Sequence, residues 1–493
     1  MELKIKLLKW SAGLPVAMLN KKTAEKIGVH SRDRISIKTL SKHPKEISTD
    51  IDIIKRFVKR DEIAVSSELK KHLNLNIGQK VEVNLSNPPE SINFIKKKMN
   101  NKSLSEKEIN TIIKDVVNNS LSESEIALFV SSSYKYGMSM KETIFMIKAI
   151  QNSGSQLRFK NKFVADKHSV GGVPGNRTTP IIVSICAAAG LIIPKNSSRA
   201  ITSAAGTADV IETIADVEFS IKELKRIIKK TNACMVWGGS LGLVPADSKI
   251  IRIEKSLKID PEAQLLASIM SKKLAAGSKY IIIDIPYGKN AKFDKKGALN
   301  LKKKFNYLGR YFKKKLKCVL TDGSQPVGCG IGPALELKDI IQIFDTNETG
   351  PQDLERKSLL LAGELLEMTG KAKKNQGIKL AEEILFSGKA FDKFKEIIKA
   401  QNGNLRRIKD AEFKRDILSK KSGKIKEINN KKINSLAIAA GCPVDKSAGV
   451  YLCYHKGDKV KKGKKLLTLH AESMPRLREA IRFYKKSKPI KIK

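Results

Sequence analysis

The stretch DKHSVGGVPGNRTT, Asp166 to Thr179, determines how this chain is interpreted, and it stands just before the apolar, helix-like run Pro180 to Ala189. Glycines let backbone amides approach an anion closely, and the start of a following helix adds partial positive charge. Lys167 and neighbouring hydroxyl groups such as that of Ser169 can complete the site. The stretch therefore predicts an anion-binding loop, although not a Walker loop, over the alternative of a tight turn with incidental polar residues.

A second hydroxyl-rich loop, NSSRAITSAAGTAD at Asn196 to Asp209, follows after an interval long enough for one strand and one helix. Arg199 can hold two oxygens of a phosphate at once, and the surrounding serine and threonine hydroxyls fit around it. A capped helix start at Thr207 is compatible with that role. Two anion-binding loops predict chemistry that involves two phosphate groups.

Around these loops the sequence has the pattern of alternating strands and helices. Apolar runs such as Tyr280 to Ile283 and helix-like stretches such as Glu355 to Met368 follow one another from about residue 160. This alternation is typical of a mainly parallel sheet that helices cover on its faces.

The segments on either side have patterns of their own. In residues 1–86, a displacement of 46 places aligns Ile35 with Val81 and Ile37 with Val83, which predicts a small duplicated barrel with a role in assembly. Asn87-Pro88-Pro89 ends it. Capping boxes at Ser105/Glu108, Ser122/Glu125 and Ser139/Glu142 then predict helices.

We therefore predict a multidomain α/β and α+β protein. Its expected parts are an N-terminal β-rich barrel (1–86), a helical domain (87–159, joined by about 246–276), a mainly parallel-sheet α/β domain (160–245 and 277–426) and a C-terminal strand-rich, hammerhead-like module (427–493).

Composition narrows the class of protein. The formal charge of +45 comes from 95 basic and 50 acidic residues, but the lysines are spread over nearly every segment, so we expect no dedicated nucleic-acid partner. The start has no long apolar region and no segment approaches the length of a membrane span, which predicts a cytoplasmic protein without a membrane partner. The six cysteines form no CxxC pair and the six histidines no cluster, so neither a zinc site nor a disulfide framework is expected.

Four motifs in order make the interpretation specific: KHSVGG at 167–172, SSRAITSAAGTAD at 197–209, PAD at 245–247 and LLASIMSKKLAAG at 265–277. Together they resemble the thymidine phosphorylase superfamily over essentially the whole chain. The variants VPGNRTT and SSRAITSAAGTAD and the additional N-terminal domain are similar to the AMP phosphorylases in particular.

The resemblance implies phosphorolysis of AMP, and of other nucleoside 5′-monophosphates such as CMP and UMP, to free base and ribose 1,5-bisphosphate. It implies a homo-oligomer built through dimers and no cofactor, with inorganic phosphate as co-substrate. The implied phosphate-binding residues are Lys167, Ser169, Ser197 and Thr207. The implied AMP-binding residues are Gly172, Ser198, Arg199, Ala200, Ile201, Thr202, Ser203, Thr207, Ser268 and Lys292. Lys272, one helical turn beyond Ser268, is expected to lie on the same face, point at the same ligand and play a supporting role.

Asp260 matches the family's proton donor, and as an Asp before Pro261 it also suits the first position of a helix. A base-contacting role for Arg252 would need a one-residue shift in the alignment of this sequence with the pyrimidine phosphorylases. Three alternatives remain: a thymidine or pyrimidine nucleoside phosphorylase, an enzyme related to anthranilate phosphoribosyltransferase, and a basic RNA-associated protein that has kept a phosphorylase scaffold.

Overall fold

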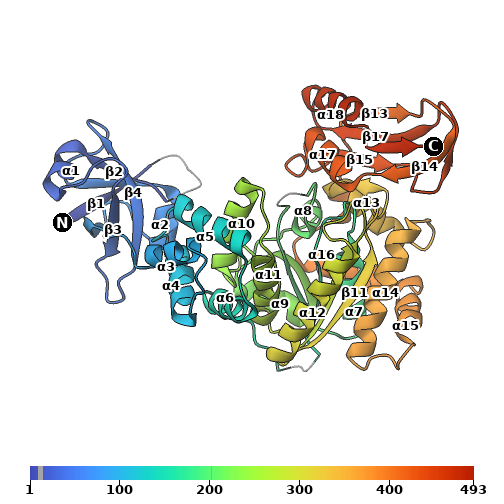
Figure 1. The fold of residues 1–493 in the computed structure, drawn as a ribbon, viewed down its shortest axis with the longest axis horizontal. Helices are drawn as coiled ribbons and strands as arrows, with labels where there is room; N and C mark the ends of the chain where they lie inside the picture. Colours follow the sequence, from blue (N-terminus) through green and yellow to red (C-terminus); the bar gives the residue numbers. More distant parts are fainter. Residues whose placement is uncertain (9–14, 161–162, 201–202) are drawn as a thin grey trace. The chain divides into compact units, whose positions relative to one another are not determined.

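A computed structural model describes residues 1–8, 15–160, 163–200 and 203–493 of the chain. It divides into two compact units. The first contains residues 1–153 and 245–264, and the second contains residues 154–244 and 265–493. Figure 1 labels their helices and strands.

The first unit begins with a closed barrel whose strand order is β1-β5-β2-β4-β3-β6. Its strands are β1 (Glu2–Leu7), β2 (Ala17–Asn20), β3 (Arg34–Thr39), β4 (Glu46–Ile54), β5 (Glu62–Val65) and β6 (Lys80–Leu85). Helix α1 (Lys21–Ile27) follows β2 as α2 (Ser67–Leu73) follows β5. Ile35, Ile37, Val81 and Val83, which the sequence aligns in pairs, are all fully buried. The predicted small barrel is confirmed.

A bundle of helices completes the first unit. It consists of α3 (Ser91–Met99), α4 (Glu106–Val117), α5 (Glu123–Tyr136), α6 (Met140–Asn152) and α10 (Pro245–Leu257). Ser105, Ser122 and Ser139 each accept a hydrogen bond from the backbone N–H three residues ahead, and the glutamate at that position closes the box. The predicted capping boxes are therefore present, and they fix where three of these helices begin.

The α/β segment of the second unit is built on parallel strands. Strands β7 (Ala165–Ser169), β10 (Tyr280–Tyr287) and β11 (Lys315–Asp322) form one sheet, and β8 (Ile193–Ser197) pairs with β9 (Ala233–Trp237). A parallel bridge between Val164 and Ile192 connects the two groups. All of these pairings are parallel, as the alternating pattern predicts.

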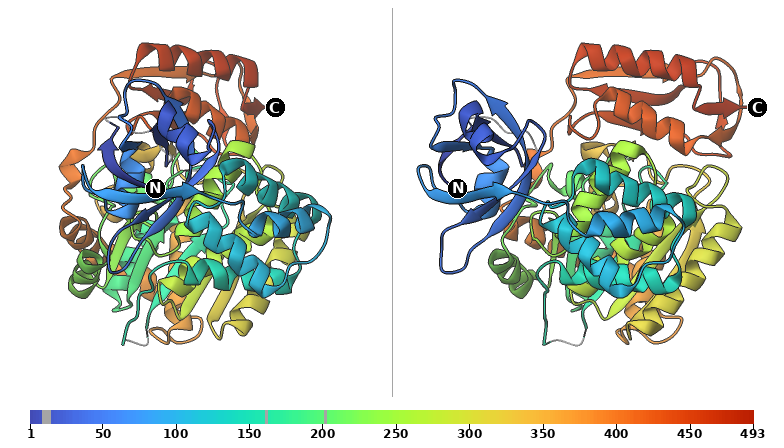
Figure 2. Two further views of the ribbon diagram at one scale, coloured as in Figure 1. Left: turned by 90° about the vertical axis from the view of Figure 1, so that its left-hand side faces the viewer. Right: turned by 60° about the vertical axis from the view of Figure 1, so that its left-hand side comes forward.

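Helices pack around these strands (Figure 2). They are α7 (Thr178–Ala188), α8 (Thr207–Ile211), α9 (Ile221–Thr231), α11 (Glu262–Ala275), α12 (Lys295–Tyr311), α13 (Pro333–Phe344), α14 (Gln352–Met368), α15 (Gly377–Phe386) and α16 (Lys389–Ala400). Residues 178–187 of α7 are all buried, and several of them belong to the apolar core that the α/β segment forms. The predicted anion-binding loop therefore precedes a well-packed helix.

The C-terminal module, which we define as residues 413–492, follows a short 3-10 helix, η1 (Leu405–Arg407). It contains β13 (Phe413–Leu418), β14 (Gly423–Ile428), α17 (Asn430–Ala440), β15 (Gly449–Leu452), β16 (Lys459–Val460), β17 (Lys465–Ala471), α18 (Met474–Ser487) and β18 (Ile490–Ile492). Its larger sheet has the order β12-β15-β17-β13, in which β12 (Gly330–Ile331) comes from the preceding α/β segment. This shared strand joins the module's sheet to the α/β segment.

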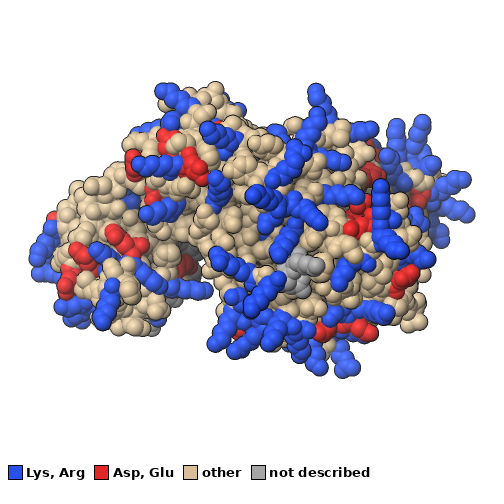
Figure 3. Space-filling model, turned by 90° about the horizontal axis from the view of Figure 1, so that it is seen from below, with Lys and Arg blue, Asp and Glu red and all other residues tan. Residues whose placement is uncertain are grey.

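Basic side chains are distributed widely over the surface. Figure 3 shows lysine and arginine side chains across the whole of the viewed face, with acidic side chains among them. None of the helices in the described part of the chain is long and apolar enough to cross a membrane.

Candidate active site

The first loop connects β7 to α7, and its glycines set its path. Gly171 and Gly172 have φ values of 84° and 88°, in the left-handed region that favours glycine. A Cβ atom on Gly172 would lie 2.7 Å from Cβ of Lys292 and 2.9 Å from its backbone nitrogen. The loop thus packs directly against Lys292, which brings together two residues predicted to contact AMP.

Lys167 is the main cation of this loop, and its side chain is only 2 % exposed. Its Nζ donates a hydrogen bond to Oγ1 of Thr178, the first residue of α7, at 2.6 Å. Burial lowers the pKa of Lys167 to about 7, while the carboxylate of Asp284 acts in the opposite direction. A phosphate dianion bound here would favour the charged ammonium group. Lys167 therefore suits a site for a small anion.

A buried group of charges lies behind Lys167. Asp166 accepts hydrogen bonds from Nζ of Lys273 at 2.6 Å and from Nζ of Lys195 at 3.4 Å. The Lys195 ammonium also donates to the carbonyl oxygen of Lys167 at 2.6 Å. Burial lowers the pKa of Lys273 to about 7 and also lowers that of Lys195, and the Asp166 carboxylate opposes both shifts. This group holds the backbone of Lys167 in place.

A second buried carboxylate supports Ser169. Asp284 accepts hydrogen bonds from Thr321 Oγ1 at 2.6 Å and from Asn176 Nδ2 at 3.1 Å, and it forms an ion pair with Lys357 at 3.2 Å. The same Asn176 nitrogen donates to Ser169 Oγ at 3.3 Å. Asp284 is therefore connected through Asn176 to the hydroxyl group predicted to bind phosphate.

Arg177 connects the first loop to the second. Its Nε donates to Glu336 at 2.6 Å, its Nη1 donates to Thr207 Oγ1 at 2.9 Å, and its Nη2 donates to the Ala205 carbonyl oxygen at 2.7 Å. Glu336 and Thr207 are both buried. The guanidinium group therefore fixes the two predicted anion-binding loops side by side.

The second loop runs from β8 to α8 and is shaped by Asp209. One carboxylate oxygen of Asp209 accepts hydrogen bonds from the backbone N–H groups of Ala200 at 2.6 Å and Gly206 at 2.8 Å. The Ser203 hydroxyl donates to the carbonyl oxygen of Ala205 at 3.0 Å. Asp209 therefore holds Ala200 and Gly206 close together ahead of α8. Ile201 and Thr202, both predicted to contact AMP, lie outside the described residues.

Two further residues predicted for the second loop are Ser197 and Ser198. Ser197 is the last residue of β8, and its hydroxyl donates to the carbonyl oxygen of Val236 on the paired strand β9 at 3.3 Å. Ser198 follows it, and the loop turns back so that a Cβ atom on Gly206 would lie 2.6 Å from the Ser198 carbonyl oxygen. The two ends of the loop are thus in contact.

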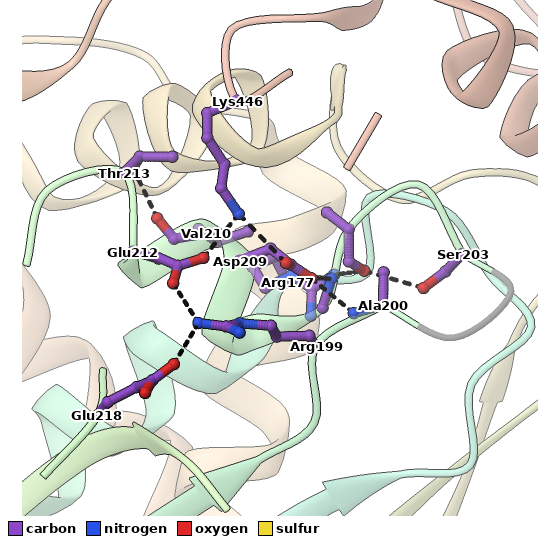
Figure 4. A network of polar contacts seen from close by, with 12 residues as sticks. Arg177, Arg199, Ala200, Ser203, Asp209, Val210, Glu212, Thr213, Glu218 and Lys446 are labelled. Atoms are coloured by element: carbon purple, nitrogen blue, oxygen red, sulfur yellow. Dashed lines mark hydrogen bonds and ion pairs between the residues drawn. The ribbon is translucent and has the colours of Figure 1, made fainter. Parts of the chain in front are cut away.

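Arg199 is held by carboxylates in the structure (Figure 4). Its Nη2 donates to Glu212 at 2.5 Å and to Glu218 at 2.8 Å, and its guanidinium group lies 4.3 Å from the ring centre of Trp237. Its side chain remains 36 % exposed. A 5′-phosphate would therefore have to share Arg199 with two glutamates.

The remaining predicted residues lie on or near α11. In the second unit, Lys272 Nζ donates to Ser268 Oγ at 2.7 Å, so the two residues predicted to face the same ligand lie next to each other. Asp260 belongs to the first unit, where it is exposed and lies two residues before α11 begins. Arg252, also in the first unit, forms an exposed ion pair with Glu123 at 3.6 Å.

Sequence reasoning missed several residues of this site, namely Asp284, Arg177, Glu336 and the pair formed by Lys195 and Lys273. One signal was available, because Asp284 interrupts the apolar strand YIIIDIPY and a charge inside a buried strand needs partners. The partners themselves lie far along the chain, as with Arg177 and Glu336, which are 159 positions apart.

Comparison with known families divides the chain into three matched segments. The model of the glycosyl transferase family helical bundle domain matches residues 92–154, and that of the glycosyl transferase family a/b domain matches residues 161–391. The pyrimidine nucleoside phosphorylase C-terminal domain matches residues 424–491. Among solved structures, the anthranilate phosphoribosyltransferase of Thermus thermophilus shares the fold, with a TM-score of 0.52, 18 % identity, and coverage of 63 % of this chain and 99 % of that one.

Relatives match over nearly the full length. The AMP phosphorylase of Methanococcus aeolicus is 42 % identical, with 99 % of this chain and 97 % of that protein covered. The AMP phosphorylases of Thermococcus sibiricus and Thermococcus kodakarensis are each 42 % identical, with 100 % of this chain and 98 % of each relative covered. On this similarity and on the three matched domains, the chain belongs to the AMP phosphorylase family, within the wider group of pentosyltransferases that contains the pyrimidine nucleoside phosphorylases.

Proposed function

We propose that this chain cleaves AMP with inorganic phosphate, releasing adenine and forming ribose 1,5-bisphosphate. The observation that carries the proposal is the bridge made by Arg177, which holds the Lys167 loop beside the loop that begins α8. Two adjacent anion-binding loops suit a reaction in which one phosphate is a substrate and the other is attached to the sugar. Full-length similarity to proteins named AMP phosphorylase supports the same assignment.

The chemistry requires positioning more than activation. An oxygen of inorganic phosphate forms a bond to C1′ of the ribose while the bond from C1′ to the adenine nitrogen breaks. The electron pair of that bond goes to the base, which takes up a proton as it leaves. Lys167, Ser169, Ser197 and Thr207 would hold the attacking phosphate, and residues 198–203 with Thr207 would hold the nucleotide. Holding both reactants in line lowers the entropic part of the barrier, and the cations stabilise the developing charge.

We assign the proton donor to Asp260. A carboxylic acid in contact with the leaving base would supply the proton that adenine needs, and general acids of this kind contribute about 10²- to 10⁴-fold to the rate. Ser268 and Lys292 would contact the nucleotide, with Lys272 supporting Ser268.

We propose that the chain accepts further nucleotides besides AMP and that it assembles into oligomers. Donors for a 5′-phosphate do not depend on the base, so CMP and UMP are expected substrates beside AMP. We also propose that the chain forms a homo-oligomer through dimers, with the N-terminal barrel (1–86) as an assembly element.

The test is a comparison of substrates with one enzyme preparation. Purified protein is incubated with phosphate and with AMP, CMP, UMP, adenosine or thymidine, and free base is measured by chromatography. The proposal expects base from the nucleotides far faster than from the nucleosides. If thymine were released from thymidine faster than adenine from AMP, the chain would be a pyrimidine nucleoside phosphorylase instead. If no base were released from any substrate, the remaining alternative would be an RNA-binding protein on this scaffold, which a measurement of salt-sensitive RNA binding would test.

A further inference from the structure

The C-terminal module contacts two of the segments that carry predicted AMP-binding residues. One contact region consists of Ala204 in the second loop and of Asp209 and Glu212 at α8, close to the predicted ligands Arg199 and Thr207. The other is the segment around Asn290, two residues before Lys292. The interactions combine apolar burial, hydrogen bonds and ion pairs, and they come from residues of α17 and of the turn that follows it.

The second loop is anchored in the core of the C-terminal module. Ala204, which is 2 % exposed, belongs to the apolar core that the module forms with Ile433, Leu436 and Ala437 of α17. The backbone N–H of Ala204 donates to Oδ1 of Asn434 on the same helix at 2.7 Å. The loop therefore cannot move away from the module without exposing an apolar side chain and losing a hydrogen bond.

Lys446 reinforces this anchor electrostatically (Figure 4). Its Nζ lies 3.3 Å from Asp209 Oδ1 and 2.8 Å from Glu212 Oε2. Asp209 is the carboxylate that holds the Ala200 and Gly206 amides and so closes the loop. Lys446 thus acts on the residue that determines the shape of the nucleotide loop.

Lys446 also influences Arg199 through a shared partner. Glu212 accepts from Lys446 through one oxygen and from Arg199 through the other. Burial alone would raise the pKa of Glu212, but the hydrogen bond and charge of Lys446, with those of Arg199, lower it overall. Without Lys446, Glu212 would hold Arg199 more strongly, because a single cation would then balance its charge. The guanidinium group of Arg199 would then be less able to donate hydrogen bonds to a 5′-phosphate.

The segment around Asn290 is held from the same module. Asn429 Nδ2 donates to Asn290 Oδ1 at 3.0 Å, and Asn430 Nδ2 donates to the Gly323 carbonyl oxygen at 2.7 Å and to the Asn290 carbonyl oxygen at 3.3 Å. Asn430 is 1 % exposed. The contacts lie immediately before Lys292, against which Gly172 packs.

We infer that the C-terminal module is a positioning element for the nucleotide's 5′-phosphate, and that Lys446 is its principal positioning residue. The inference rests on the proposed function, because it takes the second loop to be the one that binds the 5′-phosphate. Lys446 touches no substrate in this account; it acts through Asp209 and Glu212. Two of the proposed ligands of the attacking phosphate, Lys167 and Ser169, lie on β7 and not on the loop that Lys446 holds, so the loss of Lys446 should weaken AMP binding more than phosphate binding.

The test uses Lys446→Met, with Lys446→Arg as the conservative variant. Lys461→Met, which removes an exposed lysine elsewhere in the same module, is the matched control. The KM values for AMP and for phosphate are measured, together with the dissociation constant of ribose 5-phosphate by calorimetry, which reports on the 5′-phosphate site without turnover. We expect Lys446→Met to raise the KM for AMP and the ribose 5-phosphate dissociation constant roughly tenfold, about the worth of one charged hydrogen bond, while the KM for phosphate changes less. Lys446→Arg restores most of the affinity, and Lys461→Met matches the wild type.

The outcomes separate the two proposals. If the wild-type enzyme binds ribose 5-phosphate but releases no adenine from AMP, the proposed function fails while the calorimetric comparison still tests Lys446. If Lys446→Met leaves both the KM for AMP and the ribose 5-phosphate affinity unchanged, the inference is wrong. It is equally wrong if both KM values rise by the same factor together with a lower unfolding temperature, because that pattern indicates a structural role alone.

Discussion

Replacement of Lys167 by methionine tests the phosphate site at its main cation. Methionine has a similar length without the charge, and Lys167 is 2 % exposed with its Nζ bonded to Thr178. A hydrogen bond that involves a charged group contributes about 1.5–3 kcal/mol. The affinity for a phosphate-like dianion should therefore fall roughly ten- to a hundredfold.

The pH dependence of anion binding by the wild-type protein gives a second and more specific test of Lys167. With a pKa of about 7 in the free protein, Lys167 is charged below that pH and loses its proton above it. An anion prefers the charged form, so binding above pH 7 must restore the proton. Each further pH unit then costs about 1.4 kcal/mol, a tenfold loss of affinity.

Sulfate is the suitable probe for this measurement, because it stays a dianion across the range. Its dissociation constant is measured by calorimetry from pH 6 to pH 9 for the wild type, for Lys167→Met and for Lys296→Met, which changes an exposed lysine. We expect the wild type and Lys296→Met to weaken above pH 7 and Lys167→Met to bind weakly without that slope. Sulfate affinity that is independent of pH and equal in all three proteins would refute a phosphate site at Lys167.

Three further changes address other parts of the account. Asp260→Asn should retain AMP binding and lower kcat by about 10²- to 10⁴-fold, because asparagine has no acidic proton; full turnover would reduce Asp260 to a helix-capping residue. Arg199→Ala should narrow the preference for AMP over adenosine roughly ten- to a hundredfold in kcat/KM, and an unchanged preference would remove Arg199 from the 5′-phosphate site. Asp166→Asn leaves two buried lysines without their carboxylate, which should destabilise the fold by about 3–5 kcal/mol at pH 6. Buried lysines with lowered pKa values bind fewer protons in the folded than in the unfolded chain, so stability rises with pH. The loss of unfolding free energy in Asp166→Asn, measured by urea titration, should therefore be smaller at pH 9 than at pH 6. An equal loss at both pH values would contradict this electrostatic explanation.

Local signals in the sequence predicted the local structure well. The capping boxes at Ser105, Ser122 and Ser139 show where three helices begin, because a capping box depends on residues a few positions apart. The glycine-rich loop before α7 was predictable for the same reason.

The connections between segments were not predictable in this way. Arg177 meets Thr207 and Glu336, and Lys446 meets Asp209, which lies 237 positions away. Periodicity carries no information about such pairs, since they depend on how the strands and helices come together. The sharing of β12 with the sheet of the C-terminal module is a similar case, because a strand of two residues leaves almost no pattern.

The central claim is that AMP and inorganic phosphate are the two substrates, with the new bond at C1′. Its most direct measurement is a mass-spectrometric analysis of the products after incubation of the purified protein with AMP and ¹⁸O-labelled phosphate. The account predicts adenine and ribose 1,5-bisphosphate in equal amounts, with the label only in the phosphate on C1. Unlabelled ribose 5-phosphate would indicate hydrolysis by water and would contradict phosphorolysis. A labelled sugar phosphate that forms in a parallel incubation with thymidine but not from AMP would contradict the assignment of AMP as the substrate.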